Sequence, residues 1–367
     1  MSATTLSTCA GCVLLIIVAA IPVTSRLRVA ATAALITGWL LVAVLSVRYL
    51  VYRGQYLPAT RPSQIVRYGI KELTEARKNR PPNLLIIEGG SYPAAGVNPI
   101  LLRSELHRLG YRVQILDMAL SAGNHFERYT MFSDLVHNPD FPGFPPKTNT
   151  VFLAEVQNNY DKSPVAQLEK NLDTARAYQY LTPANAWYAL QSLWRGGGAV
   201  QRLKDPVWTI IRHVLVNTGN VGLPTRLTSW NSIKPSSGVT PTSAVRGFRF
   251  AGLTAVVAAA QSEQTQPFNV PWLFDIRERR LKQLWDGRMK HWVYFGIPST
   301  VDGQMKWLRT FCSATQEACI AADDRTLLHD LDSAPMWGNA GHLSRAGAAV
   351  YSRWLARQIV KTGVLRK

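Results

Sequence analysis

The spacing of apolar and polar residues divides the chain into an apolar N-terminal block and a longer mixed region. Two apolar runs, residues 9–23 and 29–47, flank a short loop that carries Arg26 and Arg28. The second run reaches the length of a membrane-spanning helix, which needs about 17–25 apolar residues. The first run is shorter, and it is either a second span or the apolar part of a signal sequence. We favour a two-helix transmembrane hairpin, with a membrane anchor over residues 1–53.

The charges around this block predict its orientation. Positively charged loops stay in the cytoplasm, so Arg26 and Arg28 place both ends of the hairpin outside it. Arg48 and Arg53, which follow the second run, argue for the opposite orientation. We expect the anchor to lie in the inner (cytoplasmic) membrane, with the soluble domain facing the periplasm.

Two cysteines in the C-terminal part bear on the same question. Cys312 and Cys319 are close enough in the chain to form a short-loop disulfide. Such a bond would fit an oxidising compartment. The alternative is that they are two unrelated free thiols.

Beyond a polar connector at residues 54–82, apolar runs of strand length alternate with stretches of helical periodicity. The expected strands are residues 83–88, 112–118, 150–156, 292–298 and 326–331. The connector itself holds an expected helix at about residues 63–78, and the expected helices beyond it are residues 99–109, 125–136, 304–310 and the segment after Ser344. This alternation predicts a parallel sheet with crossover helices, and the nearly continuous apolar strands predict burial on both faces. We expect an α/β fold, a three-layer sandwich with a flavodoxin-like parallel sheet, over residues 83–367. An insertion of helices and loops at about 160–290 interrupts it, and its tryptophans either form its own core or contact a sugar chain or lipid.

Polar residues follow the predicted strands where parallel sheets bind ligands, outside the carboxyl ends. Ser91 follows the first strand, Gly123 lies in the loop after the second, and Asn158 follows the third. His342 is expected in the loop after the fifth. A serine hydroxyl is a weak nucleophile at neutral pH unless a base takes its proton. A serine and a histidine at one sheet edge therefore predict acyl-ester chemistry.

These segments resemble the four sequence blocks of the SGNH (GDSL-type) hydrolases and acyltransferases. The resemblance covers roughly residues 83–159 and 292–360, with Gly-Gly-Ser at 89–91 and Asn-x-x-His at 339–342 as its first and last blocks. It implies an SGNH-like fold for the domain. The second block matches poorly, because Ala119 stands where the family has a glycine.

The resemblance also implies a role for each matched residue. Ser91 would be the nucleophile and His342 the base. The side chain of Asn158 and a backbone amide of the second block, near Gly123, would form the oxyanion hole.

Two residues depart from the family pattern. Gly90 replaces the aspartate before the nucleophile, and Asn339 replaces the aspartate that orients the histidine. Loss of that carboxylate in a serine triad costs about 10⁴-fold in turnover. Three interpretations stay open. Another carboxylate substitutes, with Asp332 or Asp330 nearest; the enzyme works slowly with a Ser–His dyad; or the domain no longer catalyses.

Each candidate also has a structural interpretation. Ser91 follows a strand and would serve as a helix N-cap. Asn158 would close a turn. His342 would cap the last helix or bond a backbone carbonyl.

Charge and composition limit which classes of binding partner and cofactor the chain is expected to use. The net charge of +18 attracts anionic partners, but no nucleic-acid-binding motif accompanies the scattered basic residues. The seven histidines show no metal-ligand spacing, and the predicted chemistry needs no metal or other cofactor.

The sequence as a whole predicts a membrane-anchored serine acyl-ester transferase or esterase. Its substrate would be an envelope polysaccharide or lipid-linked glycan, with an acyl donor, and the modification would be of the O-acetylation or O-acylation type. The resemblance and the anchor together imply a membrane-bound O-acyltransferase as partner. The alternative is a catalytically degenerate SGNH scaffold that binds glycan or organises a membrane-bound polysaccharide-modifying complex.

Overall fold

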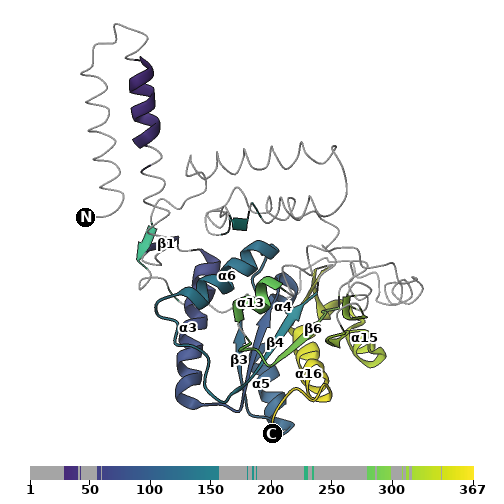
Figure 1. Cartoon of the computed structure of the whole chain (residues 1–367). Coiled ribbons are helices and arrows are strands. Elements are labelled where there is room, and N and C mark those ends of the chain that lie inside the picture. Colours follow the sequence, from purple (N-terminus) through teal and green to yellow (C-terminus); the bar gives the residue numbers. More distant parts are fainter. Residues whose placement is uncertain are drawn as a thin grey trace.

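The computed structural model describes residues 29–39, 60–156, 279–285, 287–298, 316–339 and 341–367, with a few shorter stretches between them (Figure 1). The first predicted membrane run, the last part of the second, most of the 160–290 insertion and Asn158 lie outside these residues. So does nearly all of the predicted helix 304–310. Within the described part of the chain, no helix is both long and apolar enough to cross a membrane.

The described region is an α/β fold built on a parallel sheet of five strands. They are β2 (Asn83–Glu88), β3 (Val113–Asp117), β4 (Asn149–Glu155), β6 (His291–Phe295) and β7 (Ala318–Ile320). All neighbours pair in parallel, in the order β3-β2-β4-β6-β7. Counted along the chain this is 2-1-3-4-5, a common order of doubly wound sheets. In such sheets ligands bind at the switch point, which in this order lies between β2 and β4 at their carboxyl ends.

Helices cover both faces of this sheet (Figure 1). One face packs against α3 (Arg61–Asn79), α6 (His125–His137) and α13 (Lys282–Trp285). The other packs against α5 (Pro99–Arg108), α15 (Arg325–Leu331) and α16 (Arg345–Lys361).

The strand pleat explains why the two cores are separate. Successive side chains of a strand point to opposite faces, and in β2 Ile86 lies in the first core while Ile87 lies in the second. Both are 0% exposed. Full burial of such a side chain contributes about 1.5–3 kcal/mol.

Helix boundaries predicted from the sequence hold because capping residues fix them. Asn98 caps α5 and is followed by Pro99 at the first helical position. Asn124 and Glu127 form a reciprocal capping box at the start of α6. The Ser344 side chain accepts a hydrogen bond from the Gly347 amide at the start of α16.

The prediction of a strand at residues 326–331 is wrong. This segment is the helix α15, and the fifth strand is β7. Asp324 caps the helix by accepting hydrogen bonds from the amides of Thr326 and Leu327. Leu327 and Leu331, four residues apart, share the buried face, which is a helical period. The three residues of β7 are too few to give a clear apolar run.

His342 therefore does not directly follow the fifth strand. After α15 come the 3₁₀ turn η5 (Ala334–Met336) and β8 (Trp337–Asn339), which pairs antiparallel with β9 (His342–Leu343). Two other short strands, β1 (Tyr56–Pro58) and β5 (Leu227–Ser229), form a separate antiparallel pair.

Cys312 and Cys319 form a disulfide, with Cα atoms 6.1 Å apart. This is the first of the two alternatives that the sequence left open, and the bond ties Cys312 to β7.

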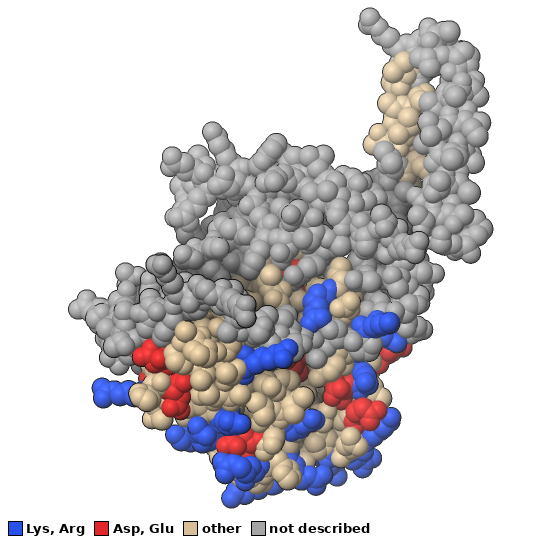
Figure 2. All heavy atoms as spheres, turned by 180° about the vertical axis from the view of Figure 1, so that it is seen from behind, with Lys and Arg blue, Asp and Glu red and all other residues tan. Residues whose placement is uncertain are grey.

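Basic residues are spread over the described surface. On the face drawn in Figure 2, Lys and Arg side chains are scattered, with Asp and Glu side chains among them. On α5, Glu105 pairs with Arg108 at 2.7 Å and lies 3.7 Å from Arg357 of α16. Exposed pairs of this kind contribute at most about 1 kcal/mol each.

Candidate active site

Ser91 lies in a tight turn at the carboxyl end of β2. The strand ends at Glu88, two buried glycines follow, and Ser91 is the first residue of a short helix, α4 (Ser91–Gly96). A side chain at Gly89 would collide with Pro93 and would come within 2.8 Å of the Glu155 carboxylate. This position therefore requires glycine. The sequence did not predict α4, because six residues give no readable helical period.

Ser91 is half-buried, and it does not cap a helix. The N-cap of α4 is Gly90, and no side chain caps this helix. Among the described residues, neither the hydroxyl nor the backbone amide of Ser91 has a hydrogen-bond partner. Both groups are therefore available to a ligand.

His342 is held in one tautomer by Asn339. The Gly341 amide donates to Asn339 Oδ1 at 3.0 Å, which fixes this atom as the oxygen. The same oxygen lies 2.8 Å from His342 Nδ1. Since an amide oxygen only accepts, Nδ1 carries the proton and Nε2 carries the lone pair.

The lone pair on Nε2 has no partner. Within the described part of the chain, Nε2 is buried and makes no hydrogen bond. Burial also lowers the pKa of His342 below its usual 6.5, because a desolvated site disfavours the charged ring. At pH 7 the imidazole is therefore neutral and able to accept a proton at Nε2.

The ring of Tyr92 connects the serine turn to this histidine. Tyr92 follows Ser91 directly, and its ring stacks on the His342 ring with centroids 5.0 Å apart and an interplanar angle of 16°. A side chain at Gly341 would come within 3.3 Å of the Tyr92 ring. The fold thus brings the Ser91 turn and His342 together, although the two side chains do not hydrogen-bond to each other. In ligand-free sites such hydrogen bonds are often long or poorly aligned.

The other predicted site residues lie as follows. The Gly123 amide donates to the Leu120 carbonyl at 3.0 Å, so in this conformation it is not available to an oxyanion. The Leu120 amide donates to Gly89 and ties this loop to the serine turn. Asp332 is an exposed residue at the end of α15 and makes no hydrogen bond to His342. Asn158 lies outside the described residues.

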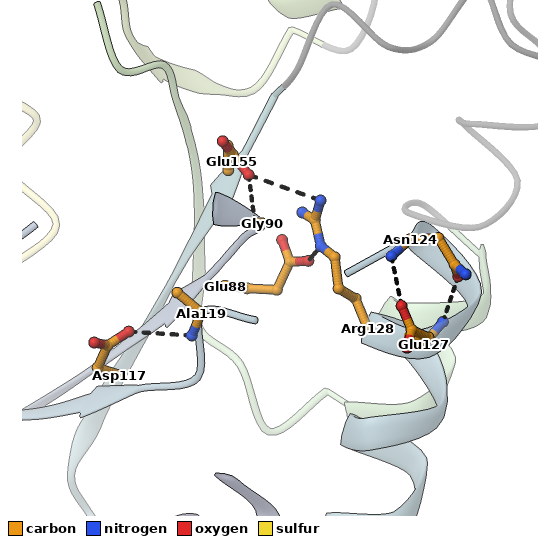
Figure 3. Close-up of polar contacts among 8 residues, drawn as sticks. All are labelled: Glu88, Gly90, Asp117, Ala119, Asn124, Glu127, Arg128 and Glu155. Carbon is orange, nitrogen blue, oxygen red and sulfur yellow. Dashed lines mark hydrogen bonds and ion pairs between the residues drawn. The ribbon is translucent and has the colours of Figure 1, made fainter. Parts of the chain in front are cut away.

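The sequence analysis missed a buried charged cluster beside Ser91 (Figure 3). Glu88 ends β2, Glu155 ends the adjacent β4, and Arg128 reaches them from α6; each side chain is at most 2% exposed. Arg128 Nε lies 2.5 Å from Glu88 Oε1, and Nη1 lies 3.7 Å from Glu155 Oε2. The sequence held a signal for this cluster, since each of two otherwise apolar strands ends in a glutamate. A buried carboxylate needs a partner, so these glutamates predicted a buried cation nearby.

A third carboxylate marks the same end of the sheet. Asp117 ends β3 and accepts a hydrogen bond from the Ala119 amide at 3.1 Å. Burial raises the pKa of Asp117 from 3.8 to about 6, although the Ala119 amide and Arg61 oppose the shift. Perturbed carboxyl groups of this kind gather at functional sites.

Sequence comparisons give no relative for this chain. No family model matches it, and no curated protein matches it. Among the described residues, no group of three or more His, Cys, Asp or Glu side chains could hold a metal ion.

Proposed function

We propose that this protein is a serine-dependent acyl-ester transferase or esterase of the SGNH type, with Ser91 as nucleophile and His342 as base. The observation that supports this best is the state of His342. Its Nδ1 is fixed by Asn339, its Nε2 lone pair has no hydrogen-bond partner among the described residues, and its ring stacks on the neighbour of Ser91.

In the proposed reaction, His342 Nε2 accepts the Ser91 proton as Oγ attacks the acyl carbonyl. The carbonyl π electrons move onto its oxygen, and the Ser91 amide and the Asn158 side chain donate to this oxyanion. Collapse expels the alcohol, which takes the proton from His342. Water or a sugar hydroxyl then attacks the acyl-serine, and the same steps release the acid or the new ester.

Asn339 limits the turnover rate expected of this reaction. Its amide oxygen orients the imidazole, but it carries no negative charge to balance the imidazolium that forms. Among the described residues, the His342 ring hydrogen-bonds to Asn339 and to no carboxylate. The dyad is therefore expected to turn over slowly compared with a complete triad.

The substrate class rests on the fold and the compartment. The strand order 2-1-3-4-5 supports a flavodoxin-like, SGNH-like domain. The Cys312–Cys319 disulfide supports an oxidising compartment, in line with a domain on the periplasmic side. With the apolar N-terminal runs as an anchor, the acceptor would be an envelope polysaccharide or lipid-linked glycan, and a membrane-bound O-acyltransferase would supply the acyl group.

The second candidate function is a non-catalytic scaffold that binds glycan or organises a polysaccharide-modifying complex. Two observations favour it: the Gly123 amide is already bonded, and Asn339 stands where an aspartate would be needed. The same fold and compartment would serve either function.

Labelling with a fluorophosphonate separates the two. The reagent forms a stable bond to an activated serine, so peptide mass spectrometry of the full-length protein should find the adduct on Ser91. The adduct should vanish in Ser91→Ala and persist in Ser104→Ala, which changes an exposed serine on α5. No adduct on the wild-type protein, with polysaccharide modification intact in Ser91→Ala cells, would establish the scaffold.

A further inference from the structure

The geometry points to Glu155, held in place by Arg128 and Glu88, as a positioning residue for the Ser91 turn. Its Oε2 accepts a hydrogen bond from the Gly90 amide at 2.6 Å. Gly90 is the N-cap of α4 and immediately precedes Ser91. Figure 3 shows the Glu155 carboxylate against this turn, with Arg128 beneath it. The inference rests on the proposed role of Ser91.

The bond joins the glycine turn to the end of a central strand. Glu155 is the last residue of β4, a central strand that pairs with β2 on one side and β6 on the other. The Gly89–Gly90 turn has no side chains of its own to fix it. A charge-assisted bond to a backbone amide is about twice as strong as a neutral one. Glu155 therefore fixes the turn relative to the sheet.

Arg128 in turn orients the glutamate. Its guanidinium lies between Glu88 and Glu155, so one cation faces two carboxylates in a buried site. Removing charges from water is costly, and apolar residues often stabilise a fold as well or better. Stability alone thus gives little reason to bury these three charges, whereas a defined position for the nucleophile turn does.

The space around Gly89 supports the same interpretation. A Cβ at this position would lie 2.8 Å from Glu155 Oε2 and 2.9 Å from Glu155 Cβ. The glutamate thus packs directly on the backbone of the turn. A displacement of about 1 Å in an active site costs up to about 10²-fold in rate.

The test uses the full-length protein and a fluorophosphonate, with the maximal labelling rate of Ser91 measured separately from reagent affinity. Glu155→Leu removes the acceptor and should lower the maximal rate by about 10–100-fold with little change in affinity. Glu155→Gln keeps an acceptor oxygen and lowers the rate less. Asn149→Leu, a buried polar change at the opposite end of β4, should leave the rate unchanged.

A second readout does not depend on catalysis. Hydrogen–deuterium exchange of a peptide covering residues 89–96 should be fastest in Glu155→Leu and intermediate in Glu155→Gln. It should equal the wild-type rate in Asn149→Leu. If Glu155→Leu does not fold, Glu155→Gln decides the matter: wild-type exchange and labelling in that variant would overturn the inference. If the wild-type protein is not labelled, the proposed function fails, while the exchange data still test the positioning role.

Discussion

The two ends of the central strands bury different kinds of polar group: neutral amides at the amino end, and carboxylates with a guanidinium at the carboxyl end. At the amino end, Asn83 of β2 and Asn149 of β4 are register partners. Both N–H groups of each amide donate, and their acceptors include the backbone carbonyls of Val364 and Arg366. At the carboxyl end, the same two strands finish in Glu88 and Glu155 around Arg128.

This difference separates a structural network from a functional candidate. The asparagines are neutral, and they tie the C-terminal segment to the sheet through satisfied donors. The glutamates are acidic, and both contact a buried arginine beside a glycine turn. Buried charge is far more costly than a hydrogen-bonded amide. The carboxyl end is where doubly wound sheets bind ligands, which makes this cluster the functional candidate.

The largest effect should come from the base at the carboxyl end. His342→Ala removes the proton acceptor and should lower the Ser91 labelling rate by about 10²–10⁴-fold. His137→Ala, which changes an exposed histidine of α6, is the matched control and should label normally. Equal rates in the two variants would remove His342 from the mechanism.

The next effect concerns the charge at the end of β3. Because burial raises the pKa of Asp117 to about 6, the native state keeps this proton between about pH 4 and 6 while the unfolded chain, with the usual value of 3.8, loses it. Stability therefore falls as the pH rises through this range. Asp117→Asn should gain up to roughly 3 kcal/mol above pH 6 and little at pH 4.

Urea unfolding at pH 4 and pH 8 measures this gain. Asp140→Asn, at an exposed position, serves as the control. A gain for Asp117→Asn that is the same at both pH values would contradict the assigned burial effect.

A smaller and opposite result is expected at the amino end. Asn83→Leu leaves the Arg112 and Arg366 carbonyls and the Asn149 amide without their partner. The free energy of unfolding should fall by about 1–3 kcal/mol, as measured by urea denaturation. Labelling of Ser91 in the folded protein should not change. A slower labelling rate would show that the two ends are coupled.

The smallest effect lies in the pH profile of labelling. Since burial lowers the pKa of His342 below 6.5, the wild-type protein should keep more than half of its maximal rate at pH 6.5. Asn339→Asp adds a negative charge beside Nδ1 and should move the half-maximal point to higher pH. A wild-type midpoint at or above 6.5 would rule out the desolvated imidazole as the base.

Much of the fold was predictable because it depends on local pattern. The strand at residues 83–88 was predicted with its observed bounds, and α5, α6 and α16 begin at recognisable caps. The prediction at residues 326–331 is wrong because so short an apolar segment fits a strand as well as a helix. The three-residue strand β7 was missed for the same reason, since short segments carry little periodicity.

The sequence by itself determined the alternation of strands and helices, hence the parallel sheet and the edge at which Ser91 stands. Only the tertiary structure decided which groups meet there. The Tyr92–His342 stack and the burial of Glu88, Arg128 and Glu155 join residues far apart in the chain. Periodicity reports which side of an element faces the core, whereas contacts between elements depend on how the packed layers place their ends.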